Sequence, residues 1–430
     1  MAMACSTERR RLTYSSTTAT AATTKWTDEL PPELLGLIVK KLTSNVVDII
    51  RFEAVCSSWN RAARLYTSAP YYTQLPQYPW LMLLILPIPI PDKWSWCPKP
   101  PRIDHESRCF FSLAENKVYK MDWKASQDFH GYGECLGSSH GWLAIREFKT
   151  MILSQEIVHL FNPISRQRLT LPLRPGKAST AKFVLSSNPS CNNNFVVVVI
   201  YDISLGPPGI AFYQHGRGGG NAAAWTDLEG SLDHYSDIVF HNNGQLFALS
   251  TNHSIQVWDF RNTYNNYPTK IMDFQPSMNR NVLDGPMTHH KKWLVESMGE
   301  ILFVERQWLW LGSDTKGAAD FYVCKLNIAA KTWEKVECLR GCALFLVRNQ
   351  SAMSLSTREL PKLEENSIYY AETYQEGDLN KRKQHGGWSE IRVGGVYKFN
   401  LETKVAKPYY LTREHVDTSY SKPVWIVPSP

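Results

Sequence analysis

Two hydrophobic patterns divide this chain. Between residues 26 and 66 apolar side chains recur at helical spacing, which predicts three short helices beginning near Pro32, Asp48 and Ser57. Proline suits the first turn of a helix, where its missing N–H costs nothing. Beyond Pro70 the pattern changes to short apolar runs separated by Gly, Asn, Asp and Pro, which is typical of strands joined by turns. The patterns predict a small helical segment followed by a β-rich body.

The β-rich part contains apolar runs that we expect to form strands. These runs are Trp142–Ile145, Ile157–Phe161, Phe195–Tyr201, Ile238–Phe240, Leu246–Leu249, Ile255–Trp258, Ile301–Val304, Phe321–Leu326, Ala343–Val347, Ser367–Tyr370 and Val396–Phe399. Several recur as a unit in which a turn, a strand, a gap and a second strand ending in Asn or Asp follow one another. Four such copies span residues 141–163, 244–259, 299–336 and 367–400.

A four-stranded antiparallel sheet repeated at about 40 to 50 residues is typical of a β-propeller blade. We therefore predict a multidomain α+β chain, with a small three-helix domain followed by a mainly antiparallel β-propeller. A pair of β-sandwiches is the alternative, and the irregular spacing of the copies leaves the number of blades open.

The same patterns set the expected domain boundaries. Residues 1–25 are rich in Thr and Ala with little apolar surface to bury, so we expect disorder there. Residues 26–66 form the predicted helical domain, residues 67–100 a linker with the first strand, and residues 101–430 the predicted propeller.

Composition excludes several classes of function. The 430 residues carry a net charge of +7, but no region is basic enough to predict nucleic-acid binding. The nine Cys are scattered and include no C-x-x-C pair, which argues against a disulfide framework and a zinc ribbon. A reducing compartment, the cytoplasm or the nucleus, fits this cysteine usage. No cofactor or metal is predicted.

The most apolar stretch does not predict a membrane helix. Residues 80–90 are interrupted by Pro87 and Pro89 and fall well short of the ~20 residues that a membrane helix needs. The beginning of the chain also lacks the continuous apolar segment of a secretory signal. We interpret residues 80–90 as a buried strand and expect no membrane association.

The first predicted helix has an apolar face that is wider than a single core contact requires. Its apolar residues cover roughly 200° of the helix surface, about twice the stripe that one core face requires. They are Leu34, Leu35, Leu37, Ile38, Val39 and Leu42. A segment of about 40 residues is also small for an independent core. The excess apolar face therefore needs a second partner, which is either another protein or the chain's own β-domain.

Leu30–Ile38 (LPPELLGLI) with Val55–Trp59 (VCSSW) resembles the F-box motif, over residues 26–66. F-box proteins bind the small Skp-type adaptor of a cullin-RING ubiquitin ligase and present a substrate with the rest of the chain. The resemblance implies adaptor contacts at Leu30, Pro31, Leu34, Leu35, Ile38, Ile50, Val55, Cys56 and Trp59. Trp59 and Phe52 have an equally good interpretation as core residues of the helical domain.

The C-terminal half adds a second resemblance. Residues 294–304 (LVESMGEILFV), 333–336 (WEKV), 343–346 (ALFL) and 366–370 (NSIYY) are similar to plant F-box proteins that carry a KIB-type β-propeller. The similarity is strongest over residues 293–400. It implies that the propeller is the substrate receptor of an SCF-type ligase and contributes no catalytic residue. The substrate itself and the rim that binds it are not encoded in any recognisable motif.

Enzyme motifs are missing from the predicted propeller. The glycine run at residues 216–220 lacks the Lys-Ser/Thr ending of a phosphate-binding loop, and there is no G-x-S-x-G sequence. His289 and His290 precede two lysines rather than spaced carboxylates, which argues against a metal site. The basic cluster 381–383 is interpreted as a solvated face or a weak nuclear signal. Two alternatives stay open: a protein that sequesters its adaptor without a cullin, and a propeller enzyme with acidic or His residues converging in its channel.

Overall fold

The computed structural model describes residues 30–42, 44–69, 76–83, 107–122, 133–148, 156–173, 178–203, 206–216, 224–229, 234–242, 244–264, 267–278, 291–308, 319–347, 352–371, 395–411 and 423–429. The chain separates into two compact units, Met1–Leu75 and Pro76–Pro430, which are considered one at a time below. The segment predicted to be disordered, residues 1–25, lies outside the described residues.

Three helices form the described part of the first unit: α2 (Pro32–Lys41), α3 (Val46–Glu53) and α4 (Ser57–Thr67). Pro32 occupies the first turn of α2, as expected from its fixed φ. The Asn45 side chain caps α3 by accepting a hydrogen bond from the Val47 N–H at 3.3 Å. The three helices predicted from the apolar spacing are therefore confirmed.

A small core holds these helices together. It consists of Leu35 and Val39 from α2, Ile49 and Phe52 from α3, and Ala63 from α4. Trp59 of α4 packs at its edge, with its ring centroid 4.3 Å from that of Phe52. Each helix thus contributes one apolar face to the core.

The second unit contains six sheets, which we number as blades 1 to 6. Blade 1 has the strand order β26 (Val424–Ile426), β1 (Trp80–Leu83), β2 (Ser107–Ser112), β3 (Lys117–Asp122). Blade 2 has the order β4 (Gly133–Ser139), β5 (Trp142–Phe148), β6 (Glu156–Phe161), β7 (Arg168–Thr170). Blade 3 has the order β8 (Ala178–Leu185), β9 (Val196–Ile203), β10 (Gly206–Gln214), β11 (Thr226–Asp227).

The remaining three blades follow in chain order. Blade 4 contains β12 (Tyr235–His241), β13 (Gln245–Ser250), β14 (Ile255–Tyr264), β15 (Tyr267–Phe274). Blade 5 contains β17 (Lys291–Ser297), β18 (Glu300–Trp308), β19 (Ala319–Asn327), β20 (Thr332–Lys335), β16 (Ser277–Met278). Blade 6 contains β22 (Met353–Ser356), β21 (Cys342–Leu346), β23 (Ser367–Ala371), β24 (Gly395–Asn400), β25 (Val405–Leu411).

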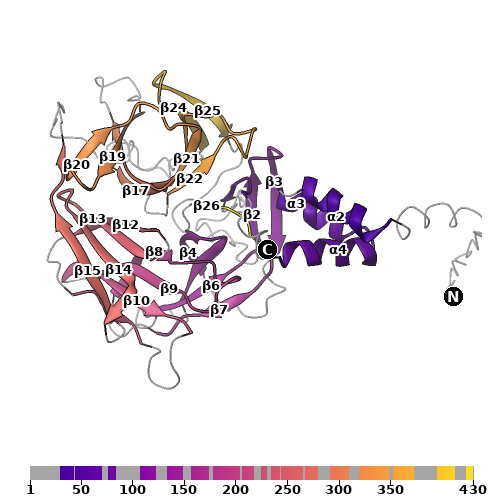
Figure 1. Cartoon of the computed structure of the whole chain (residues 1–430), viewed down its shortest axis with the longest axis horizontal. Helices are drawn as coiled ribbons and strands as arrows, with labels where there is room; N and C mark the ends of the chain where they lie inside the picture. Colours follow the sequence, from indigo (N-terminus) through magenta and orange to yellow (C-terminus); the bar gives the residue numbers. More distant parts are fainter. Residues whose placement is uncertain are drawn as a thin grey trace, which may run out of the picture. The chain divides into compact units, whose positions relative to one another are not determined.

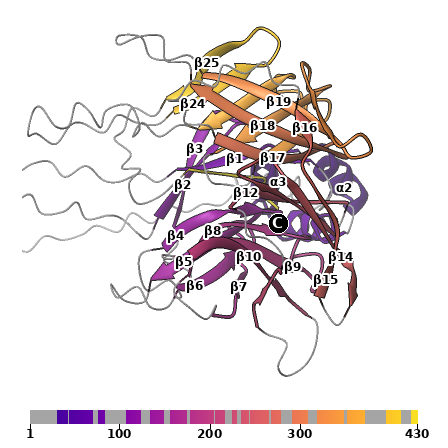
Figure 2. The same ribbon diagram turned by 90° about the vertical axis from the view of Figure 1, so that its left-hand side faces the viewer.

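The six blades follow one another around a ring (Figures 1 and 2). The first-named strand of each blade contacts that of the next, from β26 through β4, β8, β12 and β17 to β22. Neighbouring strands pair antiparallel except in two places, where β16 lies parallel to β20 and β21 parallel to β23. The predicted fold class, three helices followed by a mainly antiparallel propeller, is confirmed, and the number of blades is six.

The predicted strands and repeats have direct counterparts. Every apolar run that we assigned to a strand lies in or overlaps one. The four repeat copies correspond to β5–β6, β13–β14, β18–β20 and β23–β24, each within a single blade. Within the apolar stretch 80–90, residues 80–83 form the buried strand β1, and residues 84–90 lie outside the described residues. None of the helices in the described part of the chain has the length and apolar character that crossing a membrane requires.

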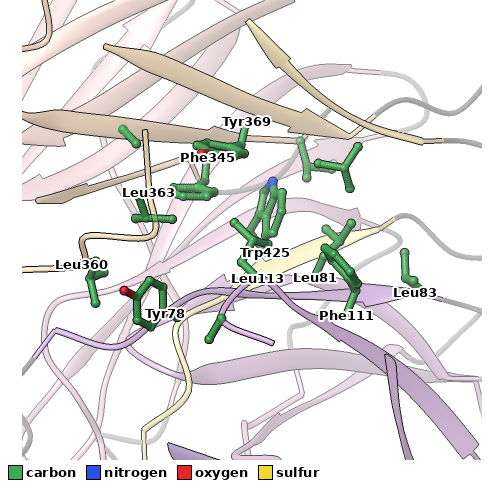
Figure 3. Close-up of a cluster of buried hydrophobic side chains, with 14 of the residues drawn as sticks. Tyr78, Leu81, Leu83, Phe111, Leu113, Phe345, Leu360, Leu363, Tyr369 and Trp425 are labelled. Atoms are coloured by element: carbon green, nitrogen blue, oxygen red, sulfur yellow. The ribbon is translucent and has the colours of Figure 1, made fainter. Parts of the chain in front are cut away.

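The two ends of the second unit pair with each other. β26 lies antiparallel to β1, with Leu81 opposite Trp425, so the last strand completes the first blade. Trp425 is fully buried, and its ring meets that of Phe345 in blade 6 at a centroid distance of 5.2 Å. Figure 3 shows Trp425 between residues of β1 and β2 on one side and Phe345 and Tyr369 on the other. Burial of this side chain therefore joins blades 1 and 6.

The residues after β26 extend this contact to blades 2 and 3. Asn162 Nδ2 donates a hydrogen bond to the Ser429 carbonyl at 2.9 Å, and Asn188 Nδ2 donates to Ser429 Oγ at 3.2 Å. Gly141, at φ +80°, faces the same residue, and a Cβ there would lie 2.7 Å from Ser429 Cβ. A side chain at position 141 would therefore displace the C-terminal residues.

Candidate protein-binding surfaces

An exposed apolar surface covers part of the helical unit. On α2, Leu34 is 46% exposed, Leu37 60% and Ile38 36%, and their spacing places them on one helix face. On the other face Leu35 is 2% exposed and Val39 is fully buried in the core. The wide apolar arc predicted for this helix therefore consists of two faces, of which only one is used inside the unit.

Other elements of the unit also carry exposed apolar side chains. Ile50 of α3, Val55 in the α3–α4 connection and Leu65 of α4 are also exposed. Pro31, which precedes α2, is exposed, and its carbonyl accepts the N–H groups of Leu34 and Leu35 at 3.0 and 3.1 Å. Exposed apolar side chains on so small a unit make these residues candidates for contact with a partner.

The structure places the nine predicted adaptor contacts in three environments. Pro31, Leu34, Ile38, Ile50 and Val55 are exposed, whereas Leu30, Cys56 and Trp59 are half-buried.

Leu35 is the exception, because it lies in the core between the three helices, where a partner protein cannot reach it. We therefore reassign Leu35 from the interface to the core of the helical unit. Trp59 also contributes to this core through its contact with Phe52.

Two exposed residues were absent from the predicted set. Leu37 lies three residues after Leu34 on the same face, and Leu65 is the most exposed apolar residue of α4 at 70%. The spacing of Leu34 and Leu37 was a sufficient signal for Leu37. Leu65 had no such signal, since a single Leu in a helix is equally compatible with a core position.

A shallow hollow lies where α3 ends and α4 begins. Its lining includes Glu53, Cys56, Asn60, Arg64 and Leu65. Asn60 Nδ2 donates to the Glu53 carbonyl at 3.2 Å, which holds the two helix ends together. Burial raises the pKa of the Glu53 carboxyl, and the nearby Arg64 guanidinium partly opposes this effect. The hollow therefore places polar groups beside the exposed Leu65.

The strands at the centre of the propeller carry a buried ion pair. Lys182 of β8 contacts the carboxylate of Asp237 of β12, and both are buried. Asp237 also accepts the backbone N–H of Leu294 in β17 and of Ile238, each at 2.7 Å. Burial lowers the pKa of Lys182 to about 7, while a carboxylate in contact favours the charged form. Asp237 thus bonds to blades 3, 4 and 5, and these bonds indicate a structural role.

A second polar cluster lies on blade 2. His159 Nε2 lies 2.9 Å from Glu147 Oε2, and His159 Nδ1 lies 3.0 Å from Thr170 Oγ1. The Arg168 guanidinium contacts both His159 and Glu147. Because each group has a partner within the cluster, this arrangement too is explained by packing of the blade.

The described residues do not test most of the positions considered for metal binding or catalysis. Among the residues that the structure describes, no three His, Cys, Asp or Glu side chains are placed to hold a metal ion. His289, His290, residues 217–220 and the basic cluster 381–383 lie outside the described residues. The expected absence of a metal and of catalytic residues therefore stays a prediction.

Comparison with known proteins agrees with these observations. The sequence profile of the KIB1-4 β-propeller family matches residues 110–398. The chain is 25% identical to "Putative F-box protein At5g55150" of Arabidopsis thaliana over 350 residues, which cover 80% of this chain and 84% of that protein. It is 22% identical to F-box protein At2g26160 of the same plant, over 82% of this chain and 98% of the other.

Among solved structures, the crystal structure of the tricorn protease aligns with 71% of this chain at a TM-score of 0.34 and 9% identity. The aligned region spans only 29% of the protease chain. The resemblance to plant F-box proteins with a KIB-type propeller is confirmed by the family profile and by the Arabidopsis relatives.

Proposed function

Because this chain belongs to the KIB1-4 β-propeller family, we propose that it is the substrate-receptor subunit of an SCF-type cullin-RING ubiquitin ligase. In this proposal residues 26–66 are an F-box that binds a Skp-type adaptor, and the adaptor connects the chain to a cullin. The propeller binds a substrate protein. The relatives named as F-box proteins support the assignment over most of the chain.

The observation that carries the proposal is the unused apolar face of α2. Leu34, Leu37 and Ile38 expose apolar surface that the unit's own core, formed by Leu35 and Val39, leaves uncovered. Burying such side chains against a partner contributes about 25 cal/mol per Å² of apolar surface. The proposed interface comprises Leu30, Pro31, Leu34, Leu37, Ile38, Ile50, Val55 and Leu65, with the exposed parts of Cys56 and Trp59.

The proposed mechanism is one of proximity. The adaptor and cullin would hold a ubiquitin-conjugating enzyme near the substrate on the propeller, which raises the effective concentration of the reacting groups. This chain would then supply binding surfaces and no catalytic residue. The cytoplasm or the nucleus is the proposed location, because the adaptor and cullin act there and the scattered Cys suit a reducing compartment.

The adaptor interface is tested by co-expressing the full chain with a plant Skp-type adaptor. We expect the double variant Leu30→Ala/Pro31→Ala and the single variant Leu37→Glu to lose adaptor binding, because central interface residues contribute about 2 kcal/mol or more each. Leu173→Glu is a matched control, since Leu173 is exposed to a similar degree but belongs to the propeller unit. Hydrogen exchange in α2–α4 verifies that the variants stay folded. Adaptor binding at the wild-type level by both variants would contradict the proposed interface.

Cullin co-precipitation separates this function from the sequestering alternative. A ligase subunit recovers the cullin together with the adaptor, and Leu37→Glu loses both. A protein that only sequesters its adaptor recovers the adaptor alone. Recovery of adaptor without cullin at saturating cullin concentration would replace the ligase assignment by the second alternative.

A further inference from the structure

The second unit has a cavity of about 310 Å³ that is lined by residues of blades 4 and 5. Its lining comes from the ends of three hairpins: His241 from the end of β12, residues 299–301 from the start of β18, and residues 325–328 from the end of β19. This volume lies at the lower end of the range found for ligand-binding pockets and holds one or two amino-acid side chains.

His241 in the wall of this cavity has an unsatisfied nitrogen. Its side chain is 7% exposed and its ring packs edge-on against Phe247 at a centroid distance of 5.7 Å. Among the described residues its Nδ1 atom has no hydrogen-bond partner, and Glu296 Oε1 lies 4.0 Å away, beyond hydrogen-bonding distance. A buried imidazole in this state loses its contacts with water without replacement, which costs free energy.

A ligand can remove this cost directly. In the neutral imidazole that carries its proton on Nε2, Nδ1 is a hydrogen-bond acceptor. An N–H group of a ligand in the cavity can therefore donate to Nδ1.

The charges around the cavity favour a cationic donor. Glu300 and Lys325 both line the cavity and pair with each other at 3.2 Å, so their charges offset. Glu296 lies beside the cavity, where its Oε1 accepts the Gly299 N–H at 2.9 Å, and its negative charge attracts a basic group. Lys331, in the neighbouring turn, has its ammonium 5.8 Å from the Phe274 ring. The aliphatic part of the lining, which is Ile301, Leu326 and Ile328, suits the methylene stem of a long basic side chain.

Met298 adds an apolar contact next to the cavity. It precedes Gly299 in the β17–β18 turn and has φ +50°, in the left-handed region that favours Asn, Asp or Gly. Its side chain is nevertheless 69% exposed. A methionine that is both strained and exposed stabilises neither the turn nor the core, so a role in binding explains it better.

We propose that this cavity binds a segment of a partner protein that carries an arginine or lysine next to an apolar residue. The basic side chain enters the cavity and donates to His241 and the glutamates, and the apolar residue covers Met298. The proposal rests on the proposed receptor function, because it names the surface of the propeller that would hold the substrate.

The test uses the full-length protein and a displayed library of random heptapeptides as the probe. We expect the selected peptides to be enriched in Arg or Lys beside a large apolar residue. A selected peptide, made synthetically, is then measured by fluorescence anisotropy. His241→Phe and Glu300→Gln should each weaken its binding about three- to tenfold, the effect of losing one hydrogen bond or one charge contact. Replacing the peptide's basic residue by norleucine should have an effect of the same size.

Met298→Asn is the most informative variant. Because Asn tolerates a positive φ, this substitution removes the methionine side chain without straining the turn. We expect it to weaken the peptide while leaving the thermal midpoint unchanged or higher. Arg340→Asn is the matched control: Arg340 has φ +49°, precedes Gly341 in the turn that leads from β20 of blade 5 to β21 of blade 6, and does not line the cavity. That variant should bind the peptide like the wild type.

Two results would overturn the proposal. If the library yields no enriched peptide, the cavity holds water only. If the enriched peptides bind the His241, Glu300 and Met298 variants as well as the wild type, they bind elsewhere. Adaptor binding, measured on the same variants, should stay at the wild-type level. Normal adaptor binding without peptide selection contradicts the cavity alone, whereas peptide selection without adaptor binding contradicts the ligase function alone.

Discussion

The helical unit and the propeller bury their apolar residues in different ways. In the propeller, each of five apolar clusters joins two neighbouring blades, so that one blade covers the next. In the helical unit the core has one layer, and Leu34, Leu37 and Ile38 are left on the opposite side of α2. A closed ring covers its sheet faces internally, whereas a three-helix segment of this length is too small to do so. The surplus apolar surface therefore identifies the helical unit, rather than the propeller, as the unit that we expect to bury apolar side chains against a partner.

Contacts of β26, the strand that closes the ring, should have the largest effect on stability. Replacing Trp425 with Ala removes a fully buried side chain shared by blades 1 and 6, which should lower the free energy of unfolding by about 3–5 kcal/mol. Leu173→Ala, at an exposed position of the propeller, should change it by less than about 0.5 kcal/mol. The free energy of unfolding of both variants is measured by denaturant unfolding, followed by far-UV circular dichroism. Equal midpoints for the two variants would show that the ring does not depend on its closing strand.

The two members of the Lys182–Asp237 pair should contribute unequally to the free energy of unfolding. Asp237→Ala leaves a buried lysine and two backbone N–H groups without their acceptor, so we expect a loss of about 3–5 kcal/mol. Lys182→Met leaves Asp237 its two backbone donors and should therefore cost less. Chemical denaturation of both variants gives the comparison. A larger loss for Lys182→Met would mean that a buried carboxylate without its lysine costs more than a buried lysine and two N–H groups without their acceptor.

Substitutions on the two faces of α2 should differ in their effect on the stability of the helical unit. Leu35→Ala creates a cavity in the helical core and should cost about 2–5 kcal/mol, which is seen as faster amide exchange throughout α2–α4. Leu37→Ala should leave that exchange unchanged, because the side chain has few contacts to lose. Hydrogen exchange with mass spectrometry resolves the two cases. Similar protection in both variants would remove the distinction between core face and binding face.

Cysteine reactivity should give the smallest effect, with no change in stability required. Cys191 and Cys338 are exposed, whereas Cys135 is buried and burial raises its pKa to about 12. At pH 8 iodoacetamide should modify Cys191 and Cys338 within minutes and Cys135 only after unfolding, as judged by peptide mass spectrometry. Rapid modification of Cys135 in the folded protein would mean that this side chain becomes exposed to solvent without global unfolding.

Local periodicity was sufficient to predict the elements but not their partners. The helical spacing after residue 30 and the repeated turn–strand units predicted the three helices and the propeller, because each depends on neighbours within a few residues. The resemblance to the F-box motif placed Leu35 in the adaptor interface together with Leu34. Both lie in one wide apolar arc, and only the contacts of α2 with α3 and α4 show which side faces the core.

The candidate surfaces show the same limit. Among the described residues of the helical unit, the F-box motif identified four of the six exposed large apolar side chains, since a short motif carries its own pattern. His241 and Met298 gave no comparable signal: one is a single His at the end of a strand, and the other is a single Met in a turn. Their significance depends on blade 5 lying beside blade 4, which brings Glu300 and Leu326 to the same cavity as His241.

The amino-acid sequence by itself determined the order of the elements, the helical and β-rich parts and the presence of a surplus apolar face, because these are encoded in short-range spacing. The tertiary structure decided the number of blades, the completion of the first blade by β26, the division of α2 into two faces and the cavity between blades 4 and 5. The reason is physical. Burial and pairing between residues hundreds of positions apart, such as Leu81 and Trp425, arise only when the chain has folded.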